Sequence, residues 1–244
     1  MNVPMIECGT GRLAMYHEHI HSWYAAHGRA FPWRGERDAY RVLIAERMLH
    51  RTQARQVIDV YANFLNHFPS VQALATAELS VVRSLLASLG LPWRFESFVP
   101  MAQQIMSEHE GKVPQTREDL LGFPGVGPYV ADAVLCFAFG QPTAVVDTNT
   151  IRVAGRYLRG VAWVGDERKR ADVRAAVRYL LDDSCPAVSN HAILDLAAII
   201  CKAKTPLCHV CPVAPGCVYG RQQMGISSTD NSGKEADHNA AGRA

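Results

Sequence analysis

The sequence predicts an all-α fold. Its 244 residues are 48% hydrophobic, which is enough apolar material for a substantial core. In most segments apolar side chains recur at the spacing of a helix face, and no stretch alternates apolar and polar residues as a half-buried strand does. Glycines and prolines separate the helical segments from one another.

The first half of the chain contains several predicted helices. A connector, Phe-Pro-Trp-Arg at residues 31–34, interrupts them with extended backbone, because a residue before proline avoids helical angles. Glycine ends two of the helical segments, at Gly28 and Gly90. In chain order the predicted helical segments are residues 12–28, residues 40–65 with a break near Thr52, two short helices within residues 70–90, and residues 99–107.

Three arginines lie four residues apart at Arg47, Arg51 and Arg55. On one continuous helix they would form a basic stripe along one side. Such a stripe is commonly a solvated face.

Residues 121–147 predict a helix, a tight hairpin and a second helix. Gly125 and Gly127 permit unusual backbone angles in the turn, and Pro128 suits the first turn of a helix, where an N–H group is dispensable. Backbone N–H groups at such a helix start favour an anion such as phosphate. An ordinary turn, with Asp147 as an ordinary N-cap of the next helix, fits the same residues.

The last part of the chain is predicted to hold two more helices and a tail. Residues 166–183 form a charged amphipathic pattern, and residues 190–200 are nearly apolar, which indicates a buried helix. From Gln222 to the end, Ser, Asp, Asn, Gly and Ala dominate without an apolar period. We expect residues 222–244 to be disordered.

Four of the seven cysteines are clustered near the end of the chain. Cys201, Cys208, Cys211 and Cys217 have six, two and five residues between them. So many thiols in a short segment indicate a metal centre, and the spacing alone allows either zinc or an iron–sulfur cluster. Cys8, Cys136 and Cys185 look unrelated to this group, and Cys136 is expected to be a buried apolar side chain.

Charge and the chain ends restrict the environment only loosely. The net charge of +2 does not by itself indicate a polyanionic partner, so any nucleic-acid footprint must come from local clustering of basic residues. The first residues do not have the pattern of a secretory signal, and no run of about 18 apolar residues occurs. We expect a soluble cytoplasmic protein, monomeric and without a membrane partner.

Two independent motifs resemble those of one enzyme family. The run from Leu121 to Asp147 is similar to the helix–hairpin–helix with Gly/Pro-Asp motif of the endonuclease III and MutY superfamily of DNA glycosylases. The spacing of the four cysteines is similar to that of the four-iron four-sulfur cluster in the same superfamily. The segment that starts at Glu46 resembles a third motif, found in MutY and the mismatch glycosylases.

The resemblance implies a base-excising enzyme with three catalytic positions. Asp147 would act on the flipped nucleotide, Glu46 would contact the base, and Tyr129 occupies the position that decides the reaction type. Lyase-competent relatives carry a lysine there, so a monofunctional enzyme is implied. The five lysines, none of them within the catalytic motifs, are Lys112, Lys169, Lys202, Lys204 and Lys234.

The resemblance also implies the DNA contacts. Gly125, Val126 and Gly127 would grip the backbone of double-stranded DNA that carries a mismatched or damaged base. Arg51 would face the unpaired partner base. Leu91 and Trp93 fall in a loop that wedges into DNA, although a tryptophan in a loop is often only a packing anchor.

The resemblance further implies the cofactor and the domain organisation. It favours a 4Fe-4S cluster over zinc, with a structural role. Two helical subdomains are expected: a six-helix domain with the hairpin at residues 37–147, and an iron–sulfur domain made of residues 1–36 and 148–221.

Tyr129 and Arg51 make the Mig-type thymine–guanine mismatch glycosylases the nearest match within the family. The expected reaction is removal of thymine or uracil opposite guanine. One alternative is a MutY-like enzyme that removes adenine opposite guanine or 8-oxoguanine. A second alternative, from another class, is a DNA-structure-binding protein that has lost its chemistry.

Overall fold

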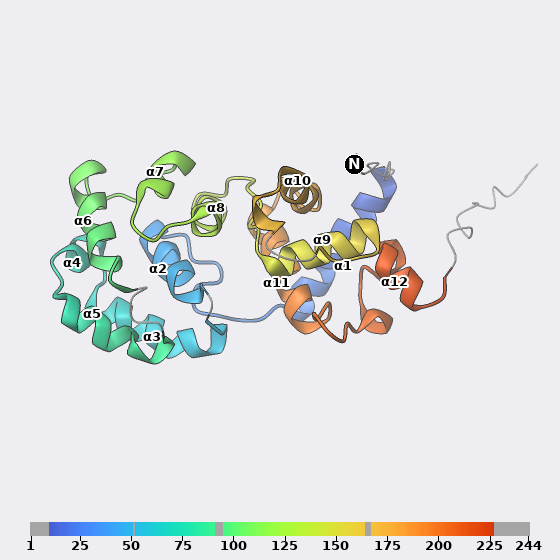
Figure 1. Ribbon diagram of the computed structural model, residues 1–244, viewed down its shortest axis with the longest axis horizontal. Helices are drawn as coiled ribbons and strands as arrows, with labels where there is room; N and C mark the ends of the chain where they lie inside the picture. Colours follow the sequence, from blue (N-terminus) through green and yellow to red (C-terminus); the bar gives the residue numbers. More distant parts are fainter. Residues whose placement is uncertain (1–9, 51, 91–94, 164–166, 227–244) are drawn as a thin grey trace, which may run out of the picture.

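The computed structural model describes residues 10–50, 52–90, 95–163 and 167–226, and within these ranges it contains helices and no strand. Two groups of helices lie side by side along the long axis (Figure 1). The prediction of an all-α fold is therefore confirmed. Among the described residues, no helix is both long and apolar enough to cross a membrane.

The first group is built from the middle of the chain. Its core contains Leu43, Met48, Phe64, Phe98 and Val134, all buried. Helix α2 packs against both α3 and α8, which places the segment of Glu46 beside the helix that follows the hairpin. The helices are α2 (Ala39–Leu49), α3 (Ala54–His67), α4 (Val71–Ala75), α5 (Leu79–Leu86), α6 (Phe98–Glu108), α7 (Arg117–Gly122) and α8 (Pro128–Phe137).

The second group joins the start of the chain to its last part. Its core contains Tyr16, Ile20, Tyr157, Ile193 and Leu196. Helix α1 packs against α11, and α9 packs against α10, α11 and α12. The helices are α1 (Thr10–His27), α9 (Thr148–Arg159), α10 (Ala171–Tyr179), α11 (Pro186–Ile199) and α12 (Val218–Gln223). These two separate cores resemble the predicted subdomains in composition, but the predicted boundaries themselves stay predictions.

Two predicted helical stretches are interrupted. The backbone of His50 and Gln53 is extended, so the expected break near Thr52 separates α2 from α3. Arg47 and Arg55 therefore lie on different helices, and the predicted basic stripe is wrong. Extended backbone at Arg170 likewise divides residues 166–183 into a short 3-10 turn and helix α10.

The C-terminal segment starts as a helix rather than as a disordered tail. Gln222 and Gln223 belong to α12, so the predicted tail begins too early. Residues 227–244 lie outside the described part of the chain.

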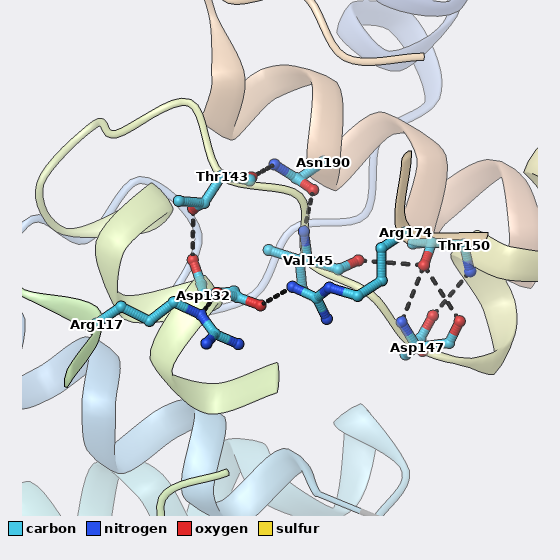
Figure 2. Close-up of polar contacts among 8 residues, drawn as sticks. All are labelled: Arg117, Asp132, Thr143, Val145, Asp147, Thr150, Arg174 and Asn190. Atoms are coloured by element: carbon cyan, nitrogen blue, oxygen red, sulfur yellow. Dashed lines mark hydrogen bonds and ion pairs between the residues drawn. The ribbon is translucent and has the colours of Figure 1, made fainter. Parts of the chain in front are cut away.

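Asn190 fixes the linker that joins the two helix groups. Its side-chain oxygen accepts the Val145 N–H at 2.9 Å, and its amide nitrogen donates to the carbonyl oxygen of Thr143 at 3.0 Å (Figure 2). The same nitrogen also donates to Pro186 at the start of α11. A buried amide bonded in this way orders the chain just before Asp147, which lies two residues beyond Val145.

Candidate functional site

The hairpin between α7 and α8 depends on Gly125 and Arg47. Gly125 has φ of +76°, a conformation that favours glycine, and a side chain there would collide with the Arg47 guanidinium. Arg47 donates to the carbonyl oxygen of Gly125 and to the Ser97 hydroxyl, and it lies over the ring of Phe98. The arginine predicted to lie on a basic face is instead buried as a support of the hairpin.

Gly127 and Val126 differ from the sequence-based expectation. Gly127 has φ of −100°, so it needs no glycine-specific backbone angle, and a side chain there would meet no neighbour. Its role is that of the N-cap before Pro128, with open space in front of it. The Val126 side chain is buried, so only its backbone is placed to meet a ligand. The N–H groups in the first turn of α8 have no partner within the helix, and they lie at the positive end of its dipole.

Asp147 is the N-cap of α9, and its carboxylate is firmly oriented. Oδ1 accepts the N–H groups of Asn149 and Thr150, both at 2.8 Å, while Oδ2 accepts the side-chain amide of Asn149 at 2.7 Å. The Thr150 hydroxyl in turn accepts the Asp147 N–H, which completes a capping box (Figure 2). The N-cap alternative thus describes the geometry correctly, and it leaves Oδ2 with unused acceptor capacity.

Glu46 and Tyr129 are in contact beside Asp147. The Glu46 side chain is 4% exposed, and its Oε2 atom has no hydrogen-bond partner in the described structure. Burial raises the pKa of Glu46 from 4.5 to about 7, against the effects of a hydrogen bond with Tyr129 and the charge of Arg34. The charge of Asp147 raises it further, so the two carboxylates are close enough to interact.

Tyr129 keeps its proton in this environment. Burial, followed by the charges of Glu46 and Asp147, raises the pKa of its hydroxyl well above the ordinary value. The phenol is therefore protonated at neutral pH and can donate a hydrogen bond to Glu46. Together the three side chains offer a carboxyl group that titrates near neutrality, a second carboxylate at a helix N-terminus, and a fixed donor. Two carboxyl groups in such different surroundings can divide acid and electrostatic roles between them.

A pocket of about 760 Å³ opens beside the hairpin. Tyr129 forms part of its wall, whereas neither Glu46 nor Asp147 lines it. Its lining carries several cationic or titratable basic side chains, which makes the pocket attractive to an anion. These residues are Arg47, His50, Arg117, Arg168, Lys169 and Arg174. Lys169, which lies outside the sequence motifs, is thus brought to the same pocket as Tyr129.

Asp132 positions two of these cations and was missed in the sequence. It is 2% exposed on the otherwise apolar α8, where it accepts Arg117 Nε at 2.7 Å and Arg174 at 2.9 Å (Figure 2). The pair with Arg174 joins α8 to α10 across the two helix groups. A lone aspartate in the apolar run of residues 130–138 was the available signal, since a buried carboxylate requires a charged partner.

The four clustered cysteines meet around one small cavity. Cys201, Cys208, Cys211 and Cys217 all line a space of about 20 Å³ between α9, α11 and α12. Among these four cysteines, all of which the structure describes, no three sulfur atoms lie within 4.8 Å of one another. Within the described part of the chain, the side chains that bring three possible metal-ligand atoms that close together are His21, Asp182 and Cys185. A single tetrahedral zinc would hold its sulfurs about 3.8 Å apart.

Donors from the protein surround these cysteines. Arg156 donates to Cys201 Sγ at 3.4 Å and to the carbonyl oxygen of Lys202 at 2.7 Å, which fixes the loop after α11. The Gly220 N–H donates to Cys217 Sγ at 3.3 Å. Burial raises the pKa of Cys217 to about 11 and outweighs the Gly220 N–H, which lowers this pKa, so the thiol would lose its proton only as a metal binds.

Three predicted DNA-contacting residues, Arg51, Leu91 and Trp93, lie outside the described residues. Their roles stay predictions.

Comparisons with known proteins agree on one family. Residues 44–177 match the model of the HhH-GPD superfamily base excision DNA repair protein. The chain is 35% identical over 221 residues to a thymine-DNA glycosylase of Aeropyrum pernix, covering 88% of this chain and 98% of that protein. It is 36% identical to the adenine DNA glycosylase of Homo sapiens, covering 80% of this chain but only 38% of that protein. The solved structure of a thermostable thymine-DNA glycosylase superposes with a TM-score of 0.78 at 28% identity, covering 87% of this chain and 98% of that one.

Proposed function

The chain belongs to the HhH-GPD superfamily of base excision DNA repair proteins, and from this premise we propose that it removes thymine or uracil mispaired with guanine. It is a DNA glycosylase, a hydrolase of N-glycosyl bonds. One observation carries the substrate proposal: the pocket wall beside Glu46 is a tyrosine. An aromatic phenol supplies an apolar surface for a pyrimidine and its methyl group, together with one fixed polar group.

Asp147 is proposed to stabilise the reacting sugar. As the glycosidic bond breaks, positive charge develops on the deoxyribose, and a fixed carboxylate nearby lowers the energy of that state. Its Oδ1 is held by two backbone N–H groups, while Oδ2 retains acceptor capacity for the attacking water. The same atom can therefore orient the water and receive its proton.

Glu46 is proposed to assist the departing base. With a pKa of about 7 the group is partly protonated at neutral pH, so it can donate a proton or a hydrogen bond to a base carbonyl. Tyr129 holds the Glu46 carboxyl in place. Because Glu46 is buried behind the pocket wall, we expect contact with the base only after the nucleotide has turned out of the helix.

Double-stranded DNA is the proposed macromolecular partner. The N–H groups at the start of α8 and the cations held by Asp132 lie along one pocket, where they suit consecutive phosphates. Arg51 is proposed to contact the guanine left behind, because an arginine offers two donors to the two acceptors of guanine. Trp93 and Leu91 are proposed to fill the space that the turned-out nucleotide leaves.

A 4Fe-4S cluster is proposed as the resident group of the four cysteines. The residues present fit it: there are four thiols, their sulfurs are too widely spread for one zinc, and Arg156 supplies a positive charge. When bound, the cluster would cross-link the segment after α11 to the start of α12, which is a structural role. Lys202 and Lys204 lie in the loop between the first two cysteines, where they are available to phosphates.

The reaction is proposed to be hydrolysis without strand cleavage. A lyase needs an amine that attacks the sugar. The hairpin position at which lyase-competent relatives carry a lysine holds Tyr129 in this chain. Lys169 is the lysine that lines the same pocket as Tyr129, so it is the candidate amine within the described residues. We also propose that the protein acts as a cytoplasmic monomer associated with DNA.

Release of free base from a mismatched duplex tests the proposed activity. Under single-turnover conditions the protein should leave an abasic site in an intact strand, which alkali then cleaves. Binding without any base release would indicate the non-catalytic alternative. Release of adenine in place of thymine would favour the MutY-like alternative. The similarity to the human adenine DNA glycosylase is the observation that supports this alternative.

A further inference from the structure

Three metal-ligand side chains meet far from the pocket, where α1 lies against the turn between α10 and α11. His21 comes from α1, Asp182 from the turn, and Cys185 is the N-cap of α11. Their ligand atoms all lie within 4.8 Å of one another. His21 Nδ1 is 3.8 Å from Cys185 Sγ and 4.0 Å from Asp182 Oδ2.

The His21 ring is held by a buried serine on its other side. Its Nε2 lies 2.9 Å from Ser189 Oγ, and Ser189 is 1% exposed on α11. In the tautomer in which Nε2–H donates to Ser189, Nδ1 keeps a lone pair for a metal ion and lies 4.0 Å from Asp182 Oδ2. Cys185 Sγ lies beside the ring, 3.8 Å from Nδ1 and 4.0 Å from Nε2. A metal-binding histidine characteristically donates its other N–H to a fixed oxygen, because this sets the ring orientation.

Asp182 presents one carboxylate oxygen to the same point. Its Oδ1 accepts the N–H of Ser184 at 2.9 Å and the Ser184 hydroxyl at 2.6 Å. Oδ2 is the atom that faces His21. The Asp182 side chain is 27% exposed and that of His21 is 21% exposed, so an ion can enter from solvent and keep a water molecule.

The protonation of two of the three groups suits a cation. The hydrogen bonds from Ser184 lower the pKa of Asp182, so it is a carboxylate at neutral pH. Burial lowers the pKa of His21, which favours the neutral ring with a free lone pair. Burial raises the pKa of Cys185, so the thiol would lose its proton to solvent as the ion binds.

We propose that His21, Asp182 and Cys185 bind one Zn²⁺ ion, with water as the fourth ligand. Nitrogen, oxygen and thiolate are the ligands of tetrahedral zinc, and zinc bond lengths place such atoms about 3.3 to 3.8 Å apart. The Nδ1–Sγ separation of 3.8 Å already lies at the edge of this range. The Nδ1–Oδ2 separation of 4.0 Å would have to close by about 0.7 Å, and the Sγ–Oδ2 separation is within 4.8 Å. His17 stacks on His21, but its Nε2 lies 3.2 Å from the carbonyl oxygen of Leu180, so it is not in the ligand set.

The site would act as a structural cross-link within the second helix group. It would tie the first helix of the described chain to the start of α11, which already packs against it. It involves none of the four clustered cysteines and none of the residues of the pocket.

Zinc uptake by the untagged, iron-loaded protein tests this proposal. After dialysis against micromolar Zn²⁺, the wild type should hold one zinc per chain at unchanged iron content, and its thermal midpoint should rise. Cys185→Ser and His21→Gln should each weaken binding at least 100-fold. Ser189→Ala, which removes the support of the His21 ring and the acceptor of the Asp182 N–H but no ligand, should weaken it about 10-fold. His27→Gln, an exposed histidine on the same helix, is the matched control and should bind as the wild type does.

Several results would overturn the proposal. These are no zinc in the wild type at 100 μM, equal zinc in Cys185→Ser, or zinc that appears only in proportion to lost iron. Circular dichroism and iron content show whether each variant is folded. If His21→Gln does not fold, Asp182→Asn and Ser189→Ala decide the result.

Discussion

The Tyr129 hydroxyl and the Glu46 carboxyl interact, and each shifts the pKa of the other, at the wall of the basic pocket. This contact joins the motif that starts at Glu46 to the hairpin motif, since Glu46 lies on α2 and Tyr129 lies in the first turn of α8. Burial of the pair holds the tyrosine protonated and raises the pKa of the glutamate to about 7. The same contact therefore supplies both a poised acid and a fixed donor to whatever enters the pocket.

The pKa of Glu46 predicts how stability depends on pH. In the unfolded chain the carboxyl ionises near 4.5, whereas in the folded protein it retains its proton to about 7. The folded state is thus favoured at low pH, and this contribution is lost as the pH rises through 7. Glu46→Gln cannot ionise. Between pH 5 and pH 8 its free energy of unfolding should therefore rise by up to roughly 3 kcal/mol relative to that of the wild type. Chemical unfolding at both pH values measures this, and a difference that does not change with pH would disprove the raised pKa.

Asp147→Asn should lose excision but keep DNA binding. The amide oxygen can still accept the N–H groups of Asn149 and Thr150, while the negative charge that stabilises the sugar cation is gone. We expect the single-turnover rate to fall by at least about 1000-fold. Affinity for mismatched DNA should change by no more than a few fold. Asp183→Asn, an exposed aspartate, is the control, and a variant at position 147 with the wild-type rate would remove Asp147 from the mechanism.

Tyr129→Lys should acquire strand-nicking activity. An amine at this place in the pocket can attack the sugar and form a Schiff base, which borohydride reduces to a stable protein–DNA adduct. The wild type should give no adduct. Because Lys169 lines the same pocket, the double variant with Lys169→Ala should retain the new activity. If adducts form in the wild type and disappear in Lys169→Ala, Lys169 is itself a lyase nucleophile.

The fold was predictable from the sequence because helix periodicity and caps are local properties. Asp147, for example, occupies the N-cap position of α9, and Pro128 lies in the first turn of α8, as the sequence indicates. The spacing of the arginines predicts a basic surface face for Arg47, whereas its side chain supports the hairpin. Its sequence neighbours do not indicate this contact, because its partner Gly125 lies 78 residues away. Asp132 and Asn190 were missed for the same reason: each acts through partners on distant elements. The contact of Glu46 with Tyr129 likewise depends on how α2 packs against α8.

Iron content tests the proposed cluster. Brown protein with about four irons per chain and little zinc at the clustered cysteines is expected. Cys217→Ser should lose the iron and destabilise the segment around α12. Cys136→Ala, which alters a buried cysteine outside the cavity, should keep it. Colourless protein that holds a single zinc in these four cysteines would contradict the proposal.

The central claim is that thymine and uracil opposite guanine are the substrates. Four duplexes that differ only in the mismatch should be compared side by side under single-turnover conditions: thymine–guanine, uracil–guanine, adenine–guanine and adenine–8-oxoguanine. The tyrosine at position 129 predicts that thymine and uracil are released at least 10-fold faster than adenine from either purine mismatch. Faster release of adenine would contradict the account and assign the protein to the adenine-removing branch of its family.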